Sequence, residues 1–383
     1  MIKNVFLKNL LIGSVFKAVS GVNKIVPKDD HKILLYSDLG FRDNVKYLYE
    51  YLINNHYNDK YKVICAVKGY ESLQENVPHN VSFVRPTQGV LAYLRSAHVF
   101  YCFGKLPISA TAKQKVIQMW HGTSFKGFAV NQTQTSANAN SFYTYVYASA
   151  PFFKPIVEKK FNISPEHITI CGHPRTDVFY QPKAKYDLGN YKKIIMWMPT
   201  FRQSKRLGQQ DTSQQTILPF LKDEDLDAFN VFLEHQQVKV IVKLHPMQDV
   251  SNIKHDQWRN LILMTNAEFE NSGMDLYRLL NLTDALITDY SSVFYDYLLL
   301  NRQIGFTESD VDEYKKHRGF AVDPEKFRPG MRIRSEKDLK QFILNIVAGY
   351  DEYEEQRQQI NNLANQIQDG TNCAVSLKLS EIN

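Results

Sequence analysis

The chain of 383 residues contains few cysteines, and these are Cys65, Cys102, Cys171 and Cys373. They are scattered, without a CxxC pair or a spacing typical of a metal site, and the first three lie in or next to β-like runs. We therefore expect buried free thiols in a reducing compartment. No apolar run approaches the roughly 18 residues that a membrane-spanning helix needs.

Motifs of several common enzyme classes are also missing. There is no GxxxxGK[ST] loop, and no GxGxxG opens a helix, which argues against ATP hydrolysis and dinucleotide redox chemistry. No HExxH motif or His/Cys cluster suggests a metal, and we expect neither a metal nor a cofactor. A metal-independent transferase would use protein cations and helix ends to stabilise a leaving phosphate or diphosphate.

The composition is that of a soluble protein with a large core. Hydrophobic residues make up 44% and charged residues 22%, and the 22 Tyr and 23 Phe bring a large buried area per residue. The formal net charge of +6 is a mild excess that favours anionic partners, and we do not expect a nucleic acid among them. The length is too great for one typical domain and suits two.

Short β-like runs alternate with helix-like segments, which predicts parallel α/β domains. We expect strands at residues 32–36, 61–67, 81–84, 99–103, 116–119, 144–148, 167–171, 193–198, 238–244, 261–264, 285–287 and 303–306. We expect helices at residues 44–55, 90–96, 152–161, 226–235, 274–280, 336–348 and 352–367. The polar stretch 131–141 should be a loop, and the stretch 181–190, with Pro and Gly, should link the two series.

The predicted fold class is therefore α/β, with two Rossmann-like domains facing a cleft and helices at the C-terminus. The predicted parts are an amphipathic segment at 1–28, domains at 29–185 and 186–350, and a helical segment at 351–383. A cleft between two such domains is the favoured place for a small-molecule site.

The first 26 residues carry lysines but no acidic residue, and their apolar residues recur near helical spacing. They lack a small-residue cleavage site after a sufficient apolar core, so we do not expect a signal peptide. A basic amphipathic helix on an anionic membrane surface fits this pattern. A helix packed on the protein's own domain fits it as well.

Polar clusters follow the predicted strands at their carboxyl ends. His121, Gly122 and Lys126 follow one strand: the histidine is a potential general base, the glycine allows close backbone approach and the lysine can pair with phosphate. Further clusters at strand ends are residues 172–177 with Arg175, residues 199–202 with Thr200 and Arg202, and residues 243–246 with Lys243 and His245. This concentration predicts a cationic cleft suited to a diphosphate ligand.

The stretch from residue 281 to 296 reads as a buried strand, a tight turn and a helix that begins at Ser291 and Ser292. Such a helix start presents free backbone N–H groups and serine hydroxyls, which suits phosphate. An ordinary helix cap is the alternative for the serines, and a structural role is the alternative for a lone histidine.

Together the clusters resemble the CDP-glycerol glycerophosphotransferase family of Gram-positive teichoic acid synthesis. The matching pieces are residues 120–123 with Lys126, residues 172–177, 199–202 and 243–246, residues 288–292 with Asp296, and Arg318-Gly319 with Pro329-Gly330. They occur in the family's order across about residues 100–335, and the ordered set is far more specific than any one piece.

The resemblance implies a glycosyltransferase-B-like architecture without a metal, a CDP-glycerol or CDP-ribitol donor, and a lipid-linked glycan or growing polymer as acceptor. It also implies peripheral attachment to the cytoplasmic face of the cell membrane, an acceptor-side domain at 29–185 and a donor domain at 186–350. His121 and His245 would be the catalytic residues. The donor would contact Ser291, Ser292, Thr200, Arg202, Asp289, Lys243 and Arg318, and the cleft would also hold Gly122, Lys126, Arg175 and Asp296.

Other functions share these features. A glycosyltransferase that uses a nucleotide sugar would have the same cleft and phosphate-binding helix end. A membrane-bound scaffold with a degenerate site would bind without turnover, although the two histidines argue against it. Because no long region precedes the first predicted strand, the resemblance points to a short single-module transferase, such as a primase or capsule enzyme. The sequence leaves open which histidine is the base.

Overall fold

The computed structural model describes residues 5–103, 106–125, 142–200, 203–204, 209–210, 218–244, 258–317 and 319–383. The stretch 131–141, expected as a loop, lies outside these residues. The chain forms two compact units. The first unit comprises Met1–Gly122, Gln134–Asp177 and Gln366–Asn383, and the second comprises Thr123–Thr133 and Val178–Asn365.

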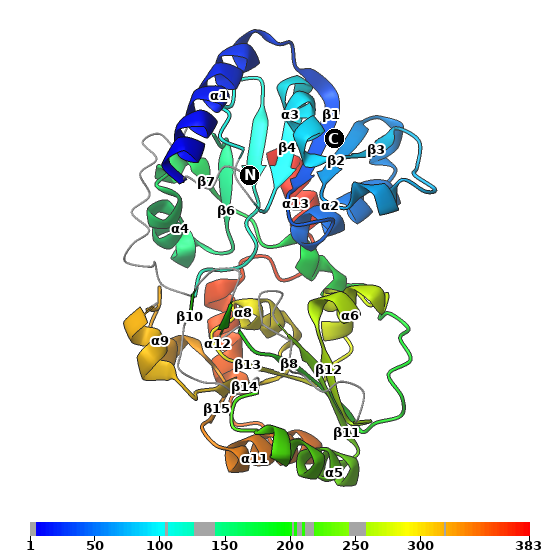
Figure 1. Ribbon diagram of the computed structural model, residues 1–383, viewed down its shortest axis with the longest axis vertical. Coiled ribbons are helices and arrows are strands. Elements are labelled where there is room, and N and C mark those ends of the chain that lie inside the picture. Colours follow the sequence, from blue (N-terminus) through cyan, green and yellow to red (C-terminus); the bar gives the residue numbers. More distant parts are fainter. Residues whose placement is uncertain are drawn as a thin grey trace. The chain divides into compact units, whose positions relative to one another are not determined.

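The first unit is a parallel sheet with helices. Its strands are β1 (Asp29–Ser37), β2 (Lys62–Val67), β3 (Val81–Val84), β4 (Ser96–Tyr101), β5 (Lys115–Gln118), β6 (Tyr145–Ala148) and β7 (Ile168–Ile170). Its helices are α1 (Val5–Ile25), α2 (Asp43–Asn54), α3 (Pro86–Arg95), α4 (Lys154–Phe161) and α13 (Asn372–Leu379). The strand order is β3-β2-β1-β4-β5-β6-β7, and neighbouring strands are parallel (Figure 1).

The second unit is a second parallel sheet with its own helices. Its strands are β8 (Lys193–Met198), β11 (Val238–Lys243), β12 (Leu261–Met264), β13 (Ala285–Thr288), β14 (Gln303–Thr307) and β15 (Met331–Ile333), in the order β12-β11-β8-β13-β14-β15. Its helices are α5 (Leu226–Gln236), α6 (Asn266–Asn271), α7 (Leu276–Leu280), α8 (Val293–Tyr297), α9 (Val311–His317), α10 (Pro324–Phe327), α11 (Glu336–Ala348) and α12 (Glu354–Ala364). A short antiparallel pair joins β9 (Gln203–Ser204) to β10 (Gln209–Gln210).

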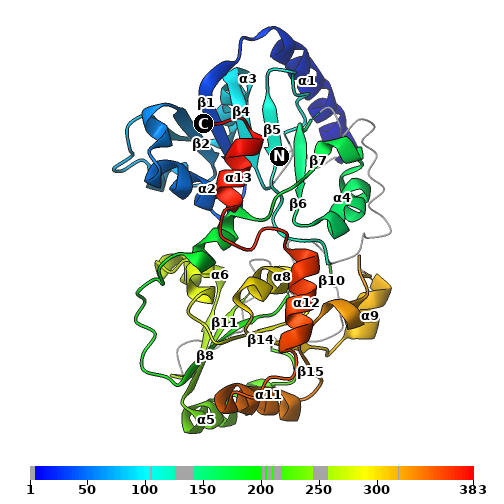
Figure 2. The ribbon, with the colours of Figure 1, turned by 180° about the vertical axis from the view of Figure 1, so that it is seen from behind.

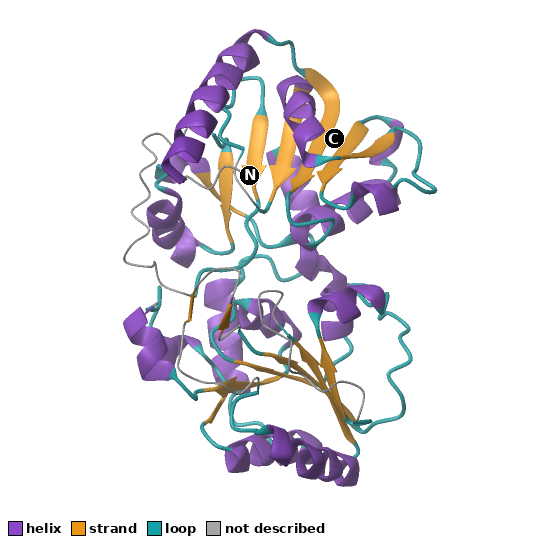
Figure 3. Cartoon of the chain, in the orientation of Figure 1, coloured by secondary structure: helices purple, strands orange, loops and turns teal. Residues whose placement is uncertain are grey.

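Continuous apolar runs explain why these strands are central. Ile33, Leu34 and Leu35 on β1 are fully buried, and so are Leu286 and Ile287 on β13. A strand reads as an unbroken apolar run when both faces of its sheet are covered, and Figure 3 shows helices on both sides of each sheet. Each fully buried leucine or isoleucine contributes about 1.5–3 kcal/mol through removal from water. The two cores therefore lie between sheet and helices in their own units.

Most expected elements are present, but the C-terminal part differs from the expectation. The segment at 303–306 is a strand, but a further strand, β15, follows it. The sequence does not predict β15, because Met331–Ile333 is short, carries Arg332 and shows little apolar signal. The helix expected at 352–367 ends at Ala364, and a separate helix, α13, follows. The units change at Asp177 and Val178, earlier than the expected boundary at 185 and 186, and the segment at 351–383 is divided between both units.

The end of α1 is fixed to the first unit by buried polar groups. Asn23 is fully buried, and its Nδ2 donates to Ser109 O at 2.9 Å and to Gln114 Oε1 at 2.7 Å. Ser20 Oγ accepts from the backbone N–H of Ser109 at 2.9 Å. The reading of this segment as a helix packed on its own domain therefore holds for its last turns. No helix among the described residues is long and apolar enough to cross a membrane.

The last residues of the chain return to the first unit, where α13 packs against α2 (Figure 2). The buried carboxylate of Asp177 holds the start of α13. It accepts from the backbone N–H of Asn372 at 3.0 Å, from Asn372 Nδ2 at 2.8 Å and from the backbone N–H of Cys373 at 2.7 Å. Gly172 permits this approach, because a Cβ at that position would lie 2.2 Å from Asn372 Oδ1.

Replacing Asp177 with asparagine should loosen α13 from the first unit. An amide offers one accepting oxygen and cannot serve all three N–H donors, so we expect the free energy of unfolding to fall by about 2 kcal/mol. Urea unfolding measures this loss, and hydrogen exchange of the α13 amides locates it. Asp369→Asn is the control, because the exposed Asp369 accepts from Thr371 in the same segment. Equal losses in the two variants would contradict the role of Asp177.

Candidate active site

Four loops of the first unit bring candidate functional side chains to the carboxyl edge of its sheet. Phe103 follows β4, His121 follows β5 and Arg175 follows β7, while Asp43 begins α2 after β1. Because β1, β4 and β5 are parallel neighbours, their carboxyl ends lie together. The contacts described next show that the loop after β7 reaches the same place.

The imidazole of His121 lies among aromatic rings. Its centroid is 5.2 Å from that of Phe103, with the two planes 15° apart, and 4.1 Å from that of Trp120, with the planes 35° apart. Lys160 Nζ lies 4.6 Å from the centroid of the Trp120 ring. The His121 side chain is nevertheless exposed. The ring is thus oriented by stacking and remains accessible to a ligand.

The backbone around His121 has an unusual conformation. Trp120 has a φ of 58° and Gly122 has a φ of 149°. A positive φ is rare for a bulky residue and costs about 1–3 kcal/mol, so it persists only where the surroundings fix it. Glycine accepts its angle without such a penalty, which explains Gly122 at this position.

Buried polar groups of the first unit hold the loop of His121 in place. Asn44 Nδ2 donates to Trp120 O at 2.7 Å, and Arg175 Nη1 donates to His121 O at 3.0 Å. Arg175 Nη1 also pairs with Asp43 Oδ1 at 2.6 Å, and the backbone N–H of Arg175 donates to Asn44 Oδ1 at 3.2 Å. The side chain of Arg175 is only 3% exposed, so it supports the loop from within the unit.

The surroundings of His121 lower the pKa of its imidazole below the ordinary value of 6.5. Loss of water around the stacked ring is the main cause; Asp43 opposes it, while Lys160 and Arg175 add to it. At neutral pH His121 is therefore uncharged and able to accept a proton.

Asp289 joins two strand ends in the second unit. It follows β13, is fully buried, and accepts from the backbone N–H of Thr200 at 3.2 and 2.9 Å and from Thr200 Oγ1 at 2.9 Å. It also accepts from the backbone N–H of Tyr290 at 2.6 Å. The loops after β8 and β13 are thus tied together. The structure places Thr200 and Asp289 in contact with each other at this edge.

Lys243 and Asp296 also have partners inside the second unit. Lys243, at the end of β11, is buried; its Nζ donates to Asn266 Oδ1 at 3.2 Å and lies 5.3 Å from the ring centroid of Phe269. Asp296 in α8 is fully buried and accepts from the hydroxyl of Tyr277 at 2.6 Å. Both residues therefore hold neighbouring elements in place.

Ser291 and Ser292 stand at the start of α8 and are half-buried. Ser291 Oγ accepts from the backbone N–H of Val293 at 3.4 Å, and Ser292 O accepts from the backbone N–H of Tyr295 at 3.2 Å. The predicted sequence of strand, tight turn and serine-led helix is therefore what the chain forms. Both serines follow the carboxyl end of β13, two and three residues after Asp289.

Four predicted site residues lie outside the described residues: Lys126, Arg202, His245 and Arg318. Among the residues that the structure does describe, no group of three or more His, Cys, Asp or Glu side chains is arranged to hold a metal ion. Among the described candidate residues, the first unit offers an uncharged histidine above a buried ion pair, and the second unit offers hydroxyl groups beside a buried carboxylate.

Sequence reasoning missed Asp43, Asn44 and Phe103. The sequence predicts Phe103 only as the end of an apolar strand, and Asn44 only as the start of a helix at 44–55. The available signal was position: Asp43 and Asn44 follow the carboxyl end of β1, the same kind of place that drew attention to the other clusters. Only the fold shows that they contact the loop of His121.

Comparisons with known proteins identify the family. The family model described as CDP-glycerol:poly(glycerophosphate) glycerophosphotransferase matches residues 18–375. A teichoic acid glycerol-phosphate transferase of Staphylococcus aureus is 26% identical over 385 residues, covering 93% of this chain and 94% of the relative. A teichoic acid ribitol-phosphate primase of Bacillus spizizenii is 29% identical over 270 residues, covering 64% of each chain.

A solved structure of the wall teichoic acid polymerase TagF has the same fold. Its TM-score is 0.73 at 22% sequence identity, with 98% of this chain and 95% of that chain covered. This match confirms the predicted α/β fold class of glycosyltransferase-B type. Because the family model spans most of the sequence, including the loops of His121, Asp289 and Ser291, the chain belongs to the CDP-glycerol:poly(glycerophosphate) glycerophosphotransferase family.

Proposed function

We propose that the protein transfers glycerol phosphate or ribitol phosphate from a CDP-alditol to a hydroxyl of a lipid-linked glycan or of a growing teichoic acid or capsule-type polymer, with release of CMP. The general class, CDP-alditol-dependent phosphotransfer, is that of the family. The relatives are named as a glycerol-phosphate transferase and a ribitol-phosphate primase, which favours a CDP-alditol donor over a nucleotide sugar. The choice between the two alditols and the identity of the acceptor belong to the proposal.

One observation supports the chemistry most directly: a neutral, solvent-accessible histidine stands at the carboxyl edge of a parallel sheet, in a loop held by buried bonds. In the transfer, the acceptor hydroxyl oxygen forms a bond to the phosphorus that carries the alditol. The bond from that phosphorus to the bridging oxygen breaks, and CMP leaves with the electron pair. The proton of the hydroxyl passes to a histidine base.

We assign the two catalytic roles to His121 and His245. One histidine accepts the proton of the attacking hydroxyl, and the other stabilises the charge that moves onto the leaving phosphate. Because its lowered pKa keeps His121 uncharged at neutral pH, we give His121 the role of base and His245 the second role. Mass measurement of the product formed from CDP-glycerol or CDP-ribitol with a lipid-linked disaccharide tests the reaction and identifies the donor.

In the second unit we propose that Ser291 and Ser292 hold the donor's pyrophosphate, because serine hydroxyls at a helix start suit phosphate oxygens. Thr200, Arg202, Lys243, Asp289 and Arg318 complete the donor side. Since Asp289 already accepts from the Thr200 and Tyr290 N–H groups, its contribution is to shape the loops that meet the donor.

Replacing His121 with alanine should reduce turnover by at least about a hundredfold, because general acid–base assistance is lost. In the wild type, protonation of His121 removes the base as the pH falls through its pKa. That pKa is lowered, so kcat/KM should persist below pH 6.5 and decline only at more acidic pH. Steady-state CMP release across pH measures both effects.

His79→Ala is the control; it changes an exposed histidine of the same unit and should retain turnover. Wild-type turnover in His121→Ala would remove His121 from the mechanism.

Replacing Ser291 and Ser292 together with alanine should weaken donor binding by about tenfold or more, in line with lost hydrogen bonds to a charged ligand. Titration calorimetry with CDP-glycerol measures the affinity. Ser272→Ala is the control, because the Ser272 hydroxyl donates to Phe269 O at the C-terminal end of α6 rather than at a helix start. A change confined to the apparent affinity for the acceptor would contradict the donor orientation proposed for the second unit.

We also propose that α1 attaches the protein to the cytoplasmic face of an anionic membrane. Val15, Val22 and Ile25 are 55%, 45% and 81% exposed, and they fall on one side of the helix, whereas Asn23 faces the domain. Lys17 and Lys24 are exposed as well. Exposed apolar and basic side chains on one helix support binding to anionic lipid through burial and surface attraction.

Replacing Lys17 and Lys24 with glutamine and Ile25 with serine should leave a folded enzyme with lower affinity for phosphatidylglycerol vesicles, since Ser20 and Asn23 still fix the helix. Deleting residues 1–26 should in addition destabilise the first unit, because Gln114 and Ser109 lose these partners. Vesicle sedimentation at rising salt measures binding, which should weaken as charges are screened. Full vesicle binding by the variant changed at Lys17, Lys24 and Ile25 would place the membrane contact elsewhere.

A further inference from the structure

We propose that Asp43 and Asn44, at the start of α2, are positioning residues that hold the backbone of His121 in the conformation that the transfer reaction needs. The inference rests on the catalytic role proposed for His121. Neither residue contacts the imidazole through a hydrogen bond that the structure shows; each acts on the main chain that carries it.

The loop of His121 requires external support. Trp120 has a φ of 58°, a conformation in which its Cβ crowds the following backbone, and the next residue carries the functional side chain. A strain of about 1–3 kcal/mol would relax by rotation of the Trp120 backbone if nothing held it. That rotation would move the imidazole away from its place beside Phe103.

Two successive carbonyl groups in the loop are held by buried donors. Asn44 is fully buried, and its Nδ2 donates to Trp120 O at 2.7 Å. Arg175 Nη1 donates to the next carbonyl, that of His121, at 3.0 Å. Fixing both carbonyls fixes the peptide plane between Trp120 and His121, and with it the direction in which the His121 side chain leaves the chain.

Asp43 in turn fixes the donor that serves His121. Its Oδ1 accepts from Arg175 Nη1 at 2.6 Å and from the backbone N–H of Asn44 at 2.8 Å. Because the Arg175 side chain is 3% exposed, its charge needs this carboxylate, and the short charged bond sets the orientation of the guanidinium. Asp43 and Asn44 thus connect the start of α2 to the two carbonyls that flank the imidazole.

The consequence for catalysis is geometric. A proton acceptor must lie within hydrogen-bond reach of the attacking hydroxyl, and a misplacement of about 1 Å costs on the order of a hundredfold in rate. Loss of the Asp43 carboxylate therefore lowers kcat more than it lowers donor affinity, which the proposed function assigns to the second unit.

Asp43→Asn is the first test, because it keeps the shape of the side chain and removes its charge. We expect kcat to fall at least about tenfold, with the KM for CDP-glycerol changed by less than about twofold. Arg175→Lys is the second variant: it keeps the positive charge but removes the planar guanidinium that bonds both Asp43 and His121 O, and it should show the same pattern.

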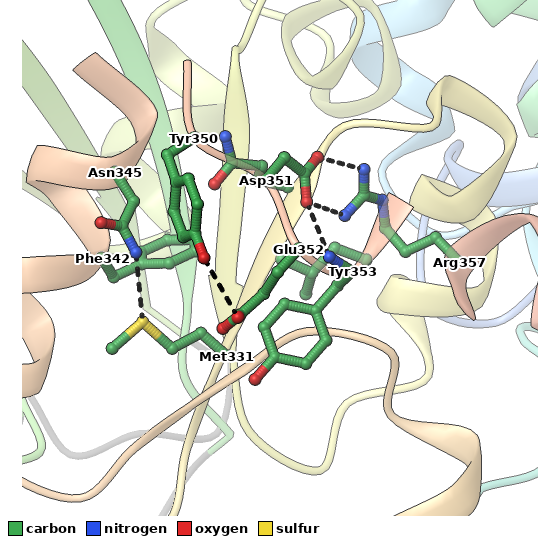
Figure 4. A pocket seen from close by; sticks show the side chains of 10 residues that line it. Met331, Phe342, Asn345, Tyr350, Asp351, Glu352, Tyr353 and Arg357 are labelled. Atoms are coloured by element: carbon green, nitrogen blue, oxygen red, sulfur yellow. Dashed lines mark hydrogen bonds and ion pairs between the residues drawn. The ribbon is translucent and has the colours of Figure 1, made fainter. Parts of the chain in front are cut away.

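Asp351→Asn is the matched control for the loss of a buried ion pair. Figure 4 shows Asp351 facing Arg357 in the second unit, with two bonds of 2.9 and 2.5 Å. The side chains of Arg357 and Asp351 are 1% and 20% exposed, and those of Arg175 and Asp43 are 3% and 17% exposed. The two substitutions should lower the Tm by similar amounts, but only Asp43→Asn should lower kcat.

A double-mutant cycle separates positioning from general stability. Adding Asp43→Asn to His121→Ala should cause no further loss of kcat, because a residue that acts through His121 has nothing left to position. Full additivity, or an equal loss of kcat in Asp351→Asn, would overturn the proposal, as would wild-type kcat in both Asp43→Asn and Arg175→Lys. A wild-type protein that releases no CMP from either CDP-alditol would reject the proposed function itself.

Discussion

The loops that leave the carboxyl edges of the two parallel sheets have no further strand to pair with, so buried polar side chains satisfy their backbone groups. In the second unit one carboxylate, that of Asp289, accepts from the N–H groups of Thr200 and Tyr290. In the first unit Asn44 and Arg175 donate to carbonyls of the loop after β5. The candidate site residues of each unit therefore lie on loops that buried hydrogen bonds hold in place.

In this arrangement buried charged residues support the loops, and an exposed histidine is the candidate for chemistry. Arg175 and Asp289 looked like ligand-binding residues because they are charged and follow strands. In the structure both are buried and bonded within their own units, whereas His121 is exposed. A charged group can be buried only where partners replace its hydration, and those partners then fix its position. The same burial that removes Arg175 from solvent makes it a precise support for the loop.

The sequence predicted the two parallel α/β units well, because their central strands are unbroken apolar runs such as Ile33–Leu35. It also predicted that strand ends would carry the polar side chains. It failed where the local signal was weak: β15 is three residues long, and α13 follows a break that apolar spacing does not show. The roles of Asp43 and Asn44 were missed because their partner, the loop of His121, is far away along the chain.

What the sequence determined by itself was the class of fold, the family and the strand ends that carry the candidate residues, since apolar periodicity and the order of short motifs are local properties. Only the tertiary structure decided which charged residues support the loops and which side chains remain accessible. It also decided that the last residues return to the first unit, where Asp177 holds α13. These features depend on contacts between segments distant in sequence, and burial of a charge is defined only when those contacts form.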